Sequence, residues 1–204
     1  GRLAHAYLFC GPRGTGKTTC ARILAKAANC LQPVNGDPCN QCEACRSIND
    51  GSATDVFELD AAAYTGVDSI RDLRDEAVYA PAELKKKVYI MDEVHMLSQS
   101  AFNALLKILE EPPEHVMFIL ASTELHKIPA TILSRCQRFE FRRIERRDIA
   151  RRLMKVAAEE GIPLAESGAS TIAHMSDGAM RNALSLLEQA SALSGSGVTL
   201  DSDG

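Results

Sequence analysis

A glycine-rich octapeptide near the start of the sequence has the spacing of a phosphate-binding loop. Residues 11–18 read Gly-Pro-Arg-Gly-Thr-Gly-Lys-Thr and match G-x-x-x-x-G-K-[ST] at every fixed position. Glycines let the backbone wrap closely around phosphate oxygens, and the positive end of a following helix adds to the attraction. We expect Lys17 to reach the β and γ phosphates of a nucleoside triphosphate, and the Thr18 hydroxyl to ligate Mg²⁺. The residues predicted to bind the nucleotide are Gly11, Pro12, Arg13, Gly14, Thr15, Gly16, Lys17, Thr18 and Thr19.

Two acidic residues, Asp92 and Glu93, follow the apolar run 88–91. Carboxylates at the end of a buried strand are costly unless they have partners or a function. In a phosphate-loop protein the first acid holds magnesium, often through water, and the second polarises the water that attacks the γ phosphate. We therefore predict that Asp92 is a Mg²⁺ ligand and that Glu93 is the general base. His95 completes a D-E-x-H string, and we interpret it as a structural residue.

Four cysteines are clustered with the spacing C-x8-C-x2-C-x2-C. Four thiolates can close a tetrahedron around one Zn²⁺, and a closed shell leaves no position for a catalytic water. We therefore predict a structural zinc site that fixes a polar, proline-broken insertion at about residues 30–45. Two disulfides are the alternative, which a reducing compartment disfavours. The predicted ligands are Cys30, Cys39, Cys42 and Cys45, whereas Cys10, Cys20 and Cys136 are interpreted as small buried hydrophobes.

Three further polar positions give weaker signals. Ser122 and Thr123 end an apolar run and would lie beside the strand that carries Asp92, where a hydroxyl can orient a water. Arg135 lies near a predicted strand, where an arginine is usually just solvated. Arg181 opens the last predicted helix, where a cation is mildly unfavourable with the helix dipole. That cost hints that Arg181 serves another purpose.

Charge and hydropathy exclude several classes of protein. The net charge of −4 argues against a protein that coats nucleic acid by charge alone. Residues 135–155 nevertheless hold nine basic and three acidic side chains, which fits a phosphate-facing surface, an acidic neighbour or a solvated helix face. The longest apolar run has six residues, whereas a membrane span needs about 18. With no leader at its start, the chain is expected to be cytoplasmic, and Gly1 in place of Met indicates an excised piece of a longer protein.

Hydrophobic periodicity predicts the elements that must position these residues. Strands and helices alternate through residue 143, which implies a parallel five-stranded sheet with helices on both faces. After that residue only helical patterns occur, so we predict an α/β domain at 1–143 and a three-helix domain at 144–204. The predicted strands are 6–10, 55–59, 88–91, 116–121 and 138–141, and the predicted helices are 17–29, 67–79, 98–110, 145–160, 166–175 and 179–193.

Taken together, these motifs resemble the AAA+ ATPases of the bacterial clamp loader, the gamma/tau family of DNA polymerase III subunits. The resemblance covers nearly the whole chain. It runs through HAYLFCGPRGTGKT, the four-cysteine insertion, VYIMDEVHMLS, AFNALLKILEEPPEHVMFILAST, ILSRCQRF and DGAMRNALSLLEQA. One departure is Ser-Thr-Glu-Leu at 122–125, where the family commonly has Thr-Thr-Asp-Pro.

The resemblance implies roles for individual residues. Thr123 falls at the first sensor of the family, and Arg135 at the arginine finger that acts on ATP bound in a neighbouring subunit. Arg181 falls at the second sensor, which reports the γ phosphate to a helical lid domain. The implied fold is an AAA+ P-loop NTPase with a zinc-binding insertion and a small lid, with ATP bound at their junction. The implied catalytic residues are Lys17, Asp92, Glu93, Thr123 and Arg135.

The resemblance also implies a function and partners. The family uses ATP binding and hydrolysis to load a sliding clamp onto primer–template DNA during replication. The implied partners are other clamp-loader subunits (delta, delta prime and further gamma/tau copies), the sliding clamp and, through the assembly, DNA. The segment that helps bind adenine in the family would precede Gly1 and is absent, so we expect weakened ATP affinity and activity of the chain alone. The chain also ends before the collar domain through which family members assemble, so we expect it to be a monomer. A non-hydrolysing scaffold subunit is the alternative, marked in such relatives by a broken phosphate loop.

Overall fold

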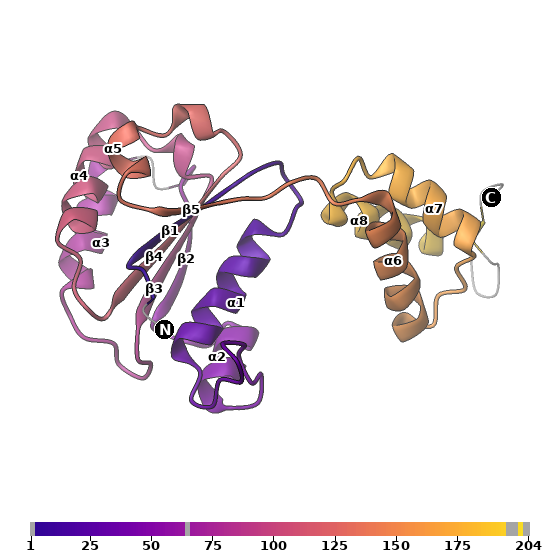
Figure 1. Cartoon of the computed structure of the whole chain (residues 1–204), viewed down its shortest axis with the longest axis horizontal. Helices are drawn as coiled ribbons and strands as arrows, with labels where there is room; N and C mark the ends of the chain where they lie inside the picture. Colours follow the sequence, from indigo (N-terminus) through magenta and orange to yellow (C-terminus); the bar gives the residue numbers. More distant parts are fainter. Residues whose placement is uncertain (1–2, 64–65, 195–199, 202–204) are drawn as a thin grey trace. The chain divides into compact units, whose positions relative to one another are not determined.

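Five short strands pair into one parallel sheet in the computed structural model, which describes residues 3–63, 66–194 and 200–201 (Figure 1). The strand order is β2-β3-β4-β1-β5, and every pairing is parallel. This confirms the predicted five-stranded parallel sheet. The strands are β1 (Ala6–Cys10), β2 (Val56–Asp60), β3 (Lys87–Asp92), β4 (Val116–Ser122) and β5 (Gln137–Glu140).

Helices cover both faces of the sheet, so its central strands are apolar at nearly every position. In β3, Tyr89 and Met91 pack in one core with Leu105 of α4, while Val88 and Ile90 point to the opposite face and are equally buried. This alternation follows from the two-residue repeat of a strand. Figure 1 shows α3 and α4 on one face and α1 and α2 on the other. The first four helices are α1 (Lys17–Asn29), α2 (Glu43–Asp50), α3 (Val67–Ala77) and α4 (Gln99–Glu110).

The beginning of α4 shows how local sequence fixes an element end. The Ser98 hydroxyl accepts a hydrogen bond from the Ala101 backbone N–H at 3.2 Å, which satisfies one of the free donors of the first turn. Ser100 lies inside the helix. Two prolines at 112–113 follow the helix and prevent its extension.

The insertion contains a helix that the sequence analysis did not predict. α2 buries Ala44, Cys45 and Ile48, and ends at Gly51 in the left-handed conformation, with φ of 78°. Lys26 of α1 anchors the insertion, because its ammonium donates to two asparagine side chains there at 2.9 and 3.1 Å. The insertion is therefore packed against α1 rather than held by its cysteines alone.

The described chain forms two compact units. One contains residues 1–10 and 17–140, and the other contains residues 11–16 and 141–204. In the second unit α6 (Arg146–Glu160), α7 (Glu166–Met175) and α8 (Met180–Ser194) share a core built on Ile149, Leu153, Ile172 and Leu187. The predicted three-helix arrangement is confirmed, while the predicted domain boundary at residue 143 stays a prediction. No helix in the described ranges is long and apolar enough to cross a membrane.

Asp55 holds the chain that leads into β3. Its side chain is 2% exposed and accepts three backbone hydrogen bonds, from Ala82, Glu83 and Leu84, at 2.7 to 2.9 Å. Burial by itself raises the pKa of Asp55, but these N–H groups outweigh it, with help from Lys87, and lower the pKa below its usual value. One ionised carboxylate therefore organises the connection before the strand that carries the acidic pair.

We predict that Asp55→Asn lowers the free energy of unfolding by about 1–3 kcal/mol at neutral pH, because an amide cannot accept all three bonds. The folded-state pKa lies below the unfolded value of about 3.9, so the stabilisation is complete above that value. This stabilisation is lost as the pH falls through the folded-state pKa of Asp55. At that acid pH the wild-type protein and Asp55→Asn should have similar free energies of unfolding. Urea unfolding at pH 7 and at acid pH measures the difference. Asp72→Asn, an exposed aspartate on α3, is the control, and an equal loss there would contradict the prediction.

Candidate nucleotide and metal sites

The carboxyl ends of three adjacent strands meet at one edge of the sheet. In the observed register Cys10 of β1 pairs with Ser122 of β4, and Met91 of β3 pairs with Leu120. The residues that follow β3 and β4 therefore gather at the edge where β1 also ends. In open parallel sheets ligands bind at this edge. The register explains why Asp92, Glu93 and Thr123 come together although they are distant in sequence.

Thr18 and Asp92 are in direct contact. The Thr18 hydroxyl donates to Oδ2 of Asp92 at 2.8 Å, across 74 residues of sequence. The other carboxylate oxygen of Asp92 accepts the backbone N–H of Glu93 at 2.9 Å. A hydroxyl and a carboxylate are hard oxygen ligands, the type that Mg²⁺ takes together with several waters. The pair therefore fits the magnesium site that the sequence predicts. Lys17, one residue earlier, has a buried side chain.

Residues 11–16 form the glycine-rich turn, which packs in the second unit. Gly11 has φ of 146°, and a Cβ there would lie 2.1 Å from the backbone oxygen of Phe141. Gly14 has φ of 76°, and its carbonyl accepts the N–H of Met180 at 2.9 Å. Both positions need glycine, because a side chain would clash or be strained. The geometry of the turn thus depends on these two glycines.

Arg181 lies beside this turn. It is the second residue of α8 and is exposed, and a Cβ on Gly14 would lie 3.5 Å from the Cβ of Arg181. The second unit thus places the predicted second sensor next to the glycine-rich turn. Thr19, by contrast, is exposed on the first turn of α1.

Glu93 adopts a backbone conformation that is unusual for a residue with a side chain. Its φ of 50° and ψ of 42° are left-handed. Non-glycine residues held there concentrate at functional sites, where surrounding contacts must offset the strain. Oε2 of Glu93 accepts from the Thr123 hydroxyl at 2.9 Å and from the Thr123 backbone N–H at 3.3 Å. The structure therefore joins the predicted base to the predicted first sensor.

Arg135 is held by its own chain. Its guanidinium pairs with Glu110 at 2.6 Å and donates to the Thr131 carbonyl at 2.8 Å, just after the short helix α5 (Ala130–Leu133). Within the described ranges it makes no hydrogen bond or ion pair with Asp92, Glu93 or Thr123. The described contacts of Arg135 therefore do not join it to the predicted catalytic residues of its own chain.

Two residues near Glu93 have contacts that the sequence did not predict. His95 was interpreted as structural, and Glu124 was not singled out. His95 lies in the one-turn helix Val94–Met96, with a side chain only 6% exposed and ring nitrogens 3.4 Å from Glu93 and from Glu124. The D-E-x-H string pointed to His95 but not to its partners. Nothing in the sequence pointed to Glu124, because a single acid after a strand has no distinctive spacing.

The four clustered cysteines have the geometry of a metal centre. Their sulfur atoms all lie within 4.8 Å of one another, and the Cys42 and Cys30 sulfurs are 4.0 Å apart. A zinc tetrahedron with Zn–S bonds of ~2.3 Å has edges of about 3.8 Å, so the cluster fits Zn²⁺. All the described cysteines are free, and the alternative of two disulfides is not formed.

Backbone N–H groups surround these sulfurs. The N–H groups of Cys39 and Cys42 point at the sulfurs of Cys30 and Cys39, each at 3.3 Å. A hydrogen bond from the Leu31 N–H is the main cause that lowers the pKa of Cys42 to about 6, whereas burial raises the pKa of Cys45 to about 12. Hydrogen bonds to sulfur favour the thiolate that zinc requires. The hydrogen bonds to the Cys30 and Cys42 sulfurs therefore favour metal binding, whereas burial works against ionisation of Cys45.

The remaining cysteines behave as small apolar groups. Burial raises the pKa of Cys10 and Cys20, and raises that of Cys136 to about 11. Each thiol thus stays protonated at neutral pH, as expected for packing residues.

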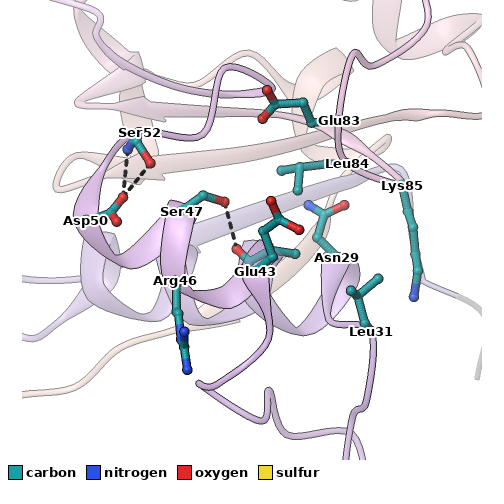
Figure 2. A pocket seen from close by; sticks show the side chains of 11 residues that line it. Asn29, Leu31, Glu43, Arg46, Ser47, Asp50, Ser52, Glu83, Leu84 and Lys85 are labelled. Atoms are coloured by element: carbon teal, nitrogen blue, oxygen red, sulfur yellow. Dashed lines mark hydrogen bonds between the residues drawn. The ribbon is translucent and has the colours of Figure 1, made fainter.

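A groove of about 930 Å³ lies beside the insertion (Figure 2). Acidic Glu43, Asp50 and Glu83 and basic Arg46 and Lys85 line it together, so it presents no single charge to a phosphate. Asn29 at the end of α1 also lines it, whereas the phosphate-binding residues Lys17 and Thr18 begin that helix. The groove is therefore not the candidate nucleotide site.

About half of the basic side chains in the segment 135–155 pair with neighbouring acids. Arg147 pairs with Glu145 at 2.8 Å and Arg151 with Asp148 at 2.6 Å, both on exposed side chains. Arg143, Lys155 and Arg135 also have acidic partners. This pairing favours the solvated helix face over a dedicated phosphate-facing surface.

The strand order, the glycine-rich turn after β1 and the acidic pair after β3 define a P-loop nucleotide-binding fold. Two family models match the chain: "DNA polymerase III, delta subunit" over residues 1–145, and "DNA polymerase III clamp loader subunit, ATPase lid domain" over residues 148–196. Solved structures support the AAA+ fold. A DNA polymerase III gamma subunit-related protein of Thermotoga maritima matches with a TM-score of 0.60 at 22% identity, over 91% of this chain and 53% of that one. A RuvB mutant of the same organism matches with a TM-score of 0.67 at 16% identity, over 97% and 59%.

Curated relatives are much more similar in sequence. DNA polymerase III subunit tau of Bacillus subtilis is 57% identical over 95% of this chain and 34% of the relative. The gamma/tau subunit of Mycoplasma pneumoniae is 53% identical over 93% and 28%, and subunit tau of Escherichia coli is 49% identical over 93% and 30%. The chain thus belongs to the family of DNA polymerase III clamp-loader subunits tau and gamma, and it spans about a third of the length of these relatives.

For the cysteine cluster, we predict about one equivalent of zinc per chain, measured by elemental analysis of the purified protein. Cys42→Ser should lose most of this zinc, because removal of one thiolate opens the shell, and should unfold at a lower temperature. Cys20→Ser, on α1 and outside the cluster, is the matched control and should keep its zinc. Equal zinc content in the two variants would contradict the assignment.

Proposed function

We propose that this chain is the ATPase part of a bacterial clamp-loader subunit, which uses ATP binding and hydrolysis to load a sliding clamp onto primer–template DNA in the cytoplasm. The contact between Thr18 and Asp92 carries this proposal, because it joins the phosphate-loop motif to the acidic pair. A glycine-rich turn formed by chance would have no reason to place its threonine on the first acid after β3.

In the proposed reaction a water attacks the γ phosphorus of ATP and the bond to the β–γ bridging oxygen breaks. Glu93 accepts the proton of the water, while Thr123 holds the Glu93 carboxylate in place. Lys17 and the N–H groups of the 11–16 turn bind the phosphates. Thr18 and Asp92 would hold Mg²⁺, which when bound neutralises charge on the β and γ phosphates. ADP and phosphate are the products.

The proposal also assigns roles in regulation and assembly to Arg135 and Arg181, as the family resemblance implies. Arg135 supplies a positive charge to ATP bound in a neighbouring subunit, which agrees with its absence from the Glu93 and Asp92 contacts of its own chain. Arg181 responds to the γ phosphate from its position beside the glycine-rich turn. The partners are the delta, delta prime and further gamma/tau subunits and the sliding clamp, with DNA reached through the assembly. Zn²⁺ at the cysteine cluster is structural.

A scaffold subunit that does not hydrolyse ATP is the rival function. Such a protein has no need to keep Lys17, Thr18, Asp92 and Glu93 together. Here all four residues are present, and the last three are joined by hydrogen bonds. The geometry thus favours the hydrolysing subunit.

The test of the base is Glu93→Gln in the complete assembly. The variant should bind ATP with unchanged affinity but turn it over about 10²- to 10⁴-fold more slowly, because an amide cannot accept the proton of the water. Phosphate release and nucleotide binding measured on the same preparation separate the two effects. Lys17→Ala, which should weaken ATP binding itself, is the companion variant. Undiminished turnover by Glu93→Gln would refute the assignment and support the scaffold.

For Arg135 we predict a defect that appears only between subunits. Arg135→Ala should leave ATP binding intact and lower turnover of the assembly by roughly 10³- to 10⁵-fold, the range for arginine fingers. Mixing Arg135→Ala subunits with Lys17→Ala subunits should restore part of the activity, since each supplies what the other lacks. Arg142→Ala, at another exposed arginine, is the control. Full activity of Arg135→Ala assemblies would rule out the role.

A further inference from the structure

His95 occupies a position that packing alone does not explain. Its side chain is 6% exposed, yet both of its ring nitrogens face polar atoms. Nδ1 lies 3.1 Å from the Ser122 hydroxyl and 3.4 Å from Oε2 of Glu93, and Nε2 lies 3.4 Å from Oε1 of Glu124. A buried imidazole between two carboxylates has its orientation set on both sides.

Glu124, which faces Nε2 of His95, is held in place by its own contacts. Glu124 pairs with Lys127 at 2.8 Å, and its backbone N–H donates to the Ser122 hydroxyl at 3.1 Å. The hydrogen bond from Lys127 is the main cause that lowers the pKa of Glu124, so this carboxylate is ionised and only accepts. Nε2 of His95 therefore faces an anionic oxygen of Glu124 at 3.4 Å. The ring plane is fixed whether or not Nδ1 is protonated, since the Ser122 hydroxyl can serve as its donor or acceptor.

The near side of His95 faces one particular oxygen of Glu93. Oε2 accepts from the Thr123 hydroxyl and backbone N–H, and the same oxygen faces Nδ1 of His95. The described contacts of the Glu93 side chain thus all converge on Oε2, and none uses Oε1. When Oε2 of a carboxylate is fixed by several contacts, the direction of Oε1 is fixed as well.

We propose that His95 is a positioning residue, which with Thr123 grips Oε2 of Glu93 so that Oε1 is directed at the attacking water. Glu124 and Ser122 fix the orientation of the His95 imidazole. This rests on the proposed role of Glu93 as general base. It replaces the interpretation of His95 as a merely structural residue, and it gives Glu124 a purpose that its position in the sequence does not reveal.

The experiment measures ATP affinity, KM and kcat for variants in the complete assembly. His95→Ala should lower kcat by up to about 10²-fold, because a misplaced catalytic group has an effect of that size, while KM and ATP affinity stay unchanged. His95→Gln keeps an amide donor that can reach Glu124 and should recover part of the loss, whereas His95→Leu fills the space without a donor and should not. Equal kcat for the Gln and Leu variants would show that His95 only packs, and would overturn the proposal.

Glu124→Gln keeps the proposal testable if the His95 variants fold poorly, because Glu124 is partly exposed and its replacement disturbs no core. The neutral amide of this variant removes the negative charge that faces the His95 imidazole, so kcat should fall. The melting temperature and the zinc content should equal those of the wild-type protein. His126→Ala is the matched control, since His126 is 76% exposed and lies 3.7 Å from the other oxygen of Glu124. A full kcat for Glu124→Gln, or an equal loss for His126→Ala, would overturn the proposal.

Glu93→Gln separates this inference from the proposed function. If that variant keeps full turnover, the base assignment itself fails. If it loses turnover while His95→Ala and Glu124→Gln do not, only the positioning role fails. In the Glu93→Gln background, His95→Ala should cause no further loss, because it acts through the group already removed. An additional loss there would show that His95 acts by another route, which contradicts the proposal.

Discussion

Parallel pairing of β4 with both β1 and β3 is the constraint on which the candidate site depends. It brings three chain segments to one edge of the sheet, and the register aligns Cys10 with Ser122 and Met91 with Leu120. A shift by one residue would exchange the faces of a strand and turn the residues after it away from their partners. Because both faces of β3 and β4 are buried under helices, such a shift would put side chains of the wrong size into each closely packed face and is disfavoured. Core packing therefore fixes the geometry of polar residues that take no part in it.

Spacing along the chain was enough to propose the candidate site residues and to predict the sheet. The octapeptide at 11–18, the acidic pair and the cysteine cluster each carry a local pattern, and the strand and helix periods located the sheet. These patterns did not predict α2, whose short apolar face of Ala44, Cys45 and Ile48 is interrupted by charges and includes a cysteine already assigned to metal. They could not predict that Glu110 faces Arg135 or that Glu124 faces His95, because such pairs depend on how distant segments approach one another.

The insertion with the four clustered cysteines lies at the opposite end of α1 from the predicted phosphate-binding residues. The helix begins with Lys17 and Thr18 and ends at Asn29, so its 13 residues separate the two by about 20 Å. At the far end Lys85 donates to the Cys30 carbonyl at 2.7 Å, and the fully buried Asn29 accepts the N–H of Lys86 at 2.8 Å. These bonds tie the insertion to α1 and to the segment before β3. A metal at that distance acts by holding the two elements together, which agrees with a closed four-thiolate shell.

The contact between Arg135 and Glu110 bears on how the proposed arginine finger could be controlled. Both side chains are partly exposed, at 33% and 48%, and such ion pairs contribute only about 0–1 kcal/mol. That is enough to keep the guanidinium near one position in a separate chain, but too little to hold it there against a triphosphate, which carries more charge than a carboxylate. Assembly can therefore exchange Glu110 for phosphate at low cost. In contrast, Glu93 accepts two hydrogen bonds from Thr123 and lies 3.4 Å from His95 within its own chain. The proposed base would therefore be in place before the proposed finger arrives, and the approach of a neighbouring subunit would complete the site.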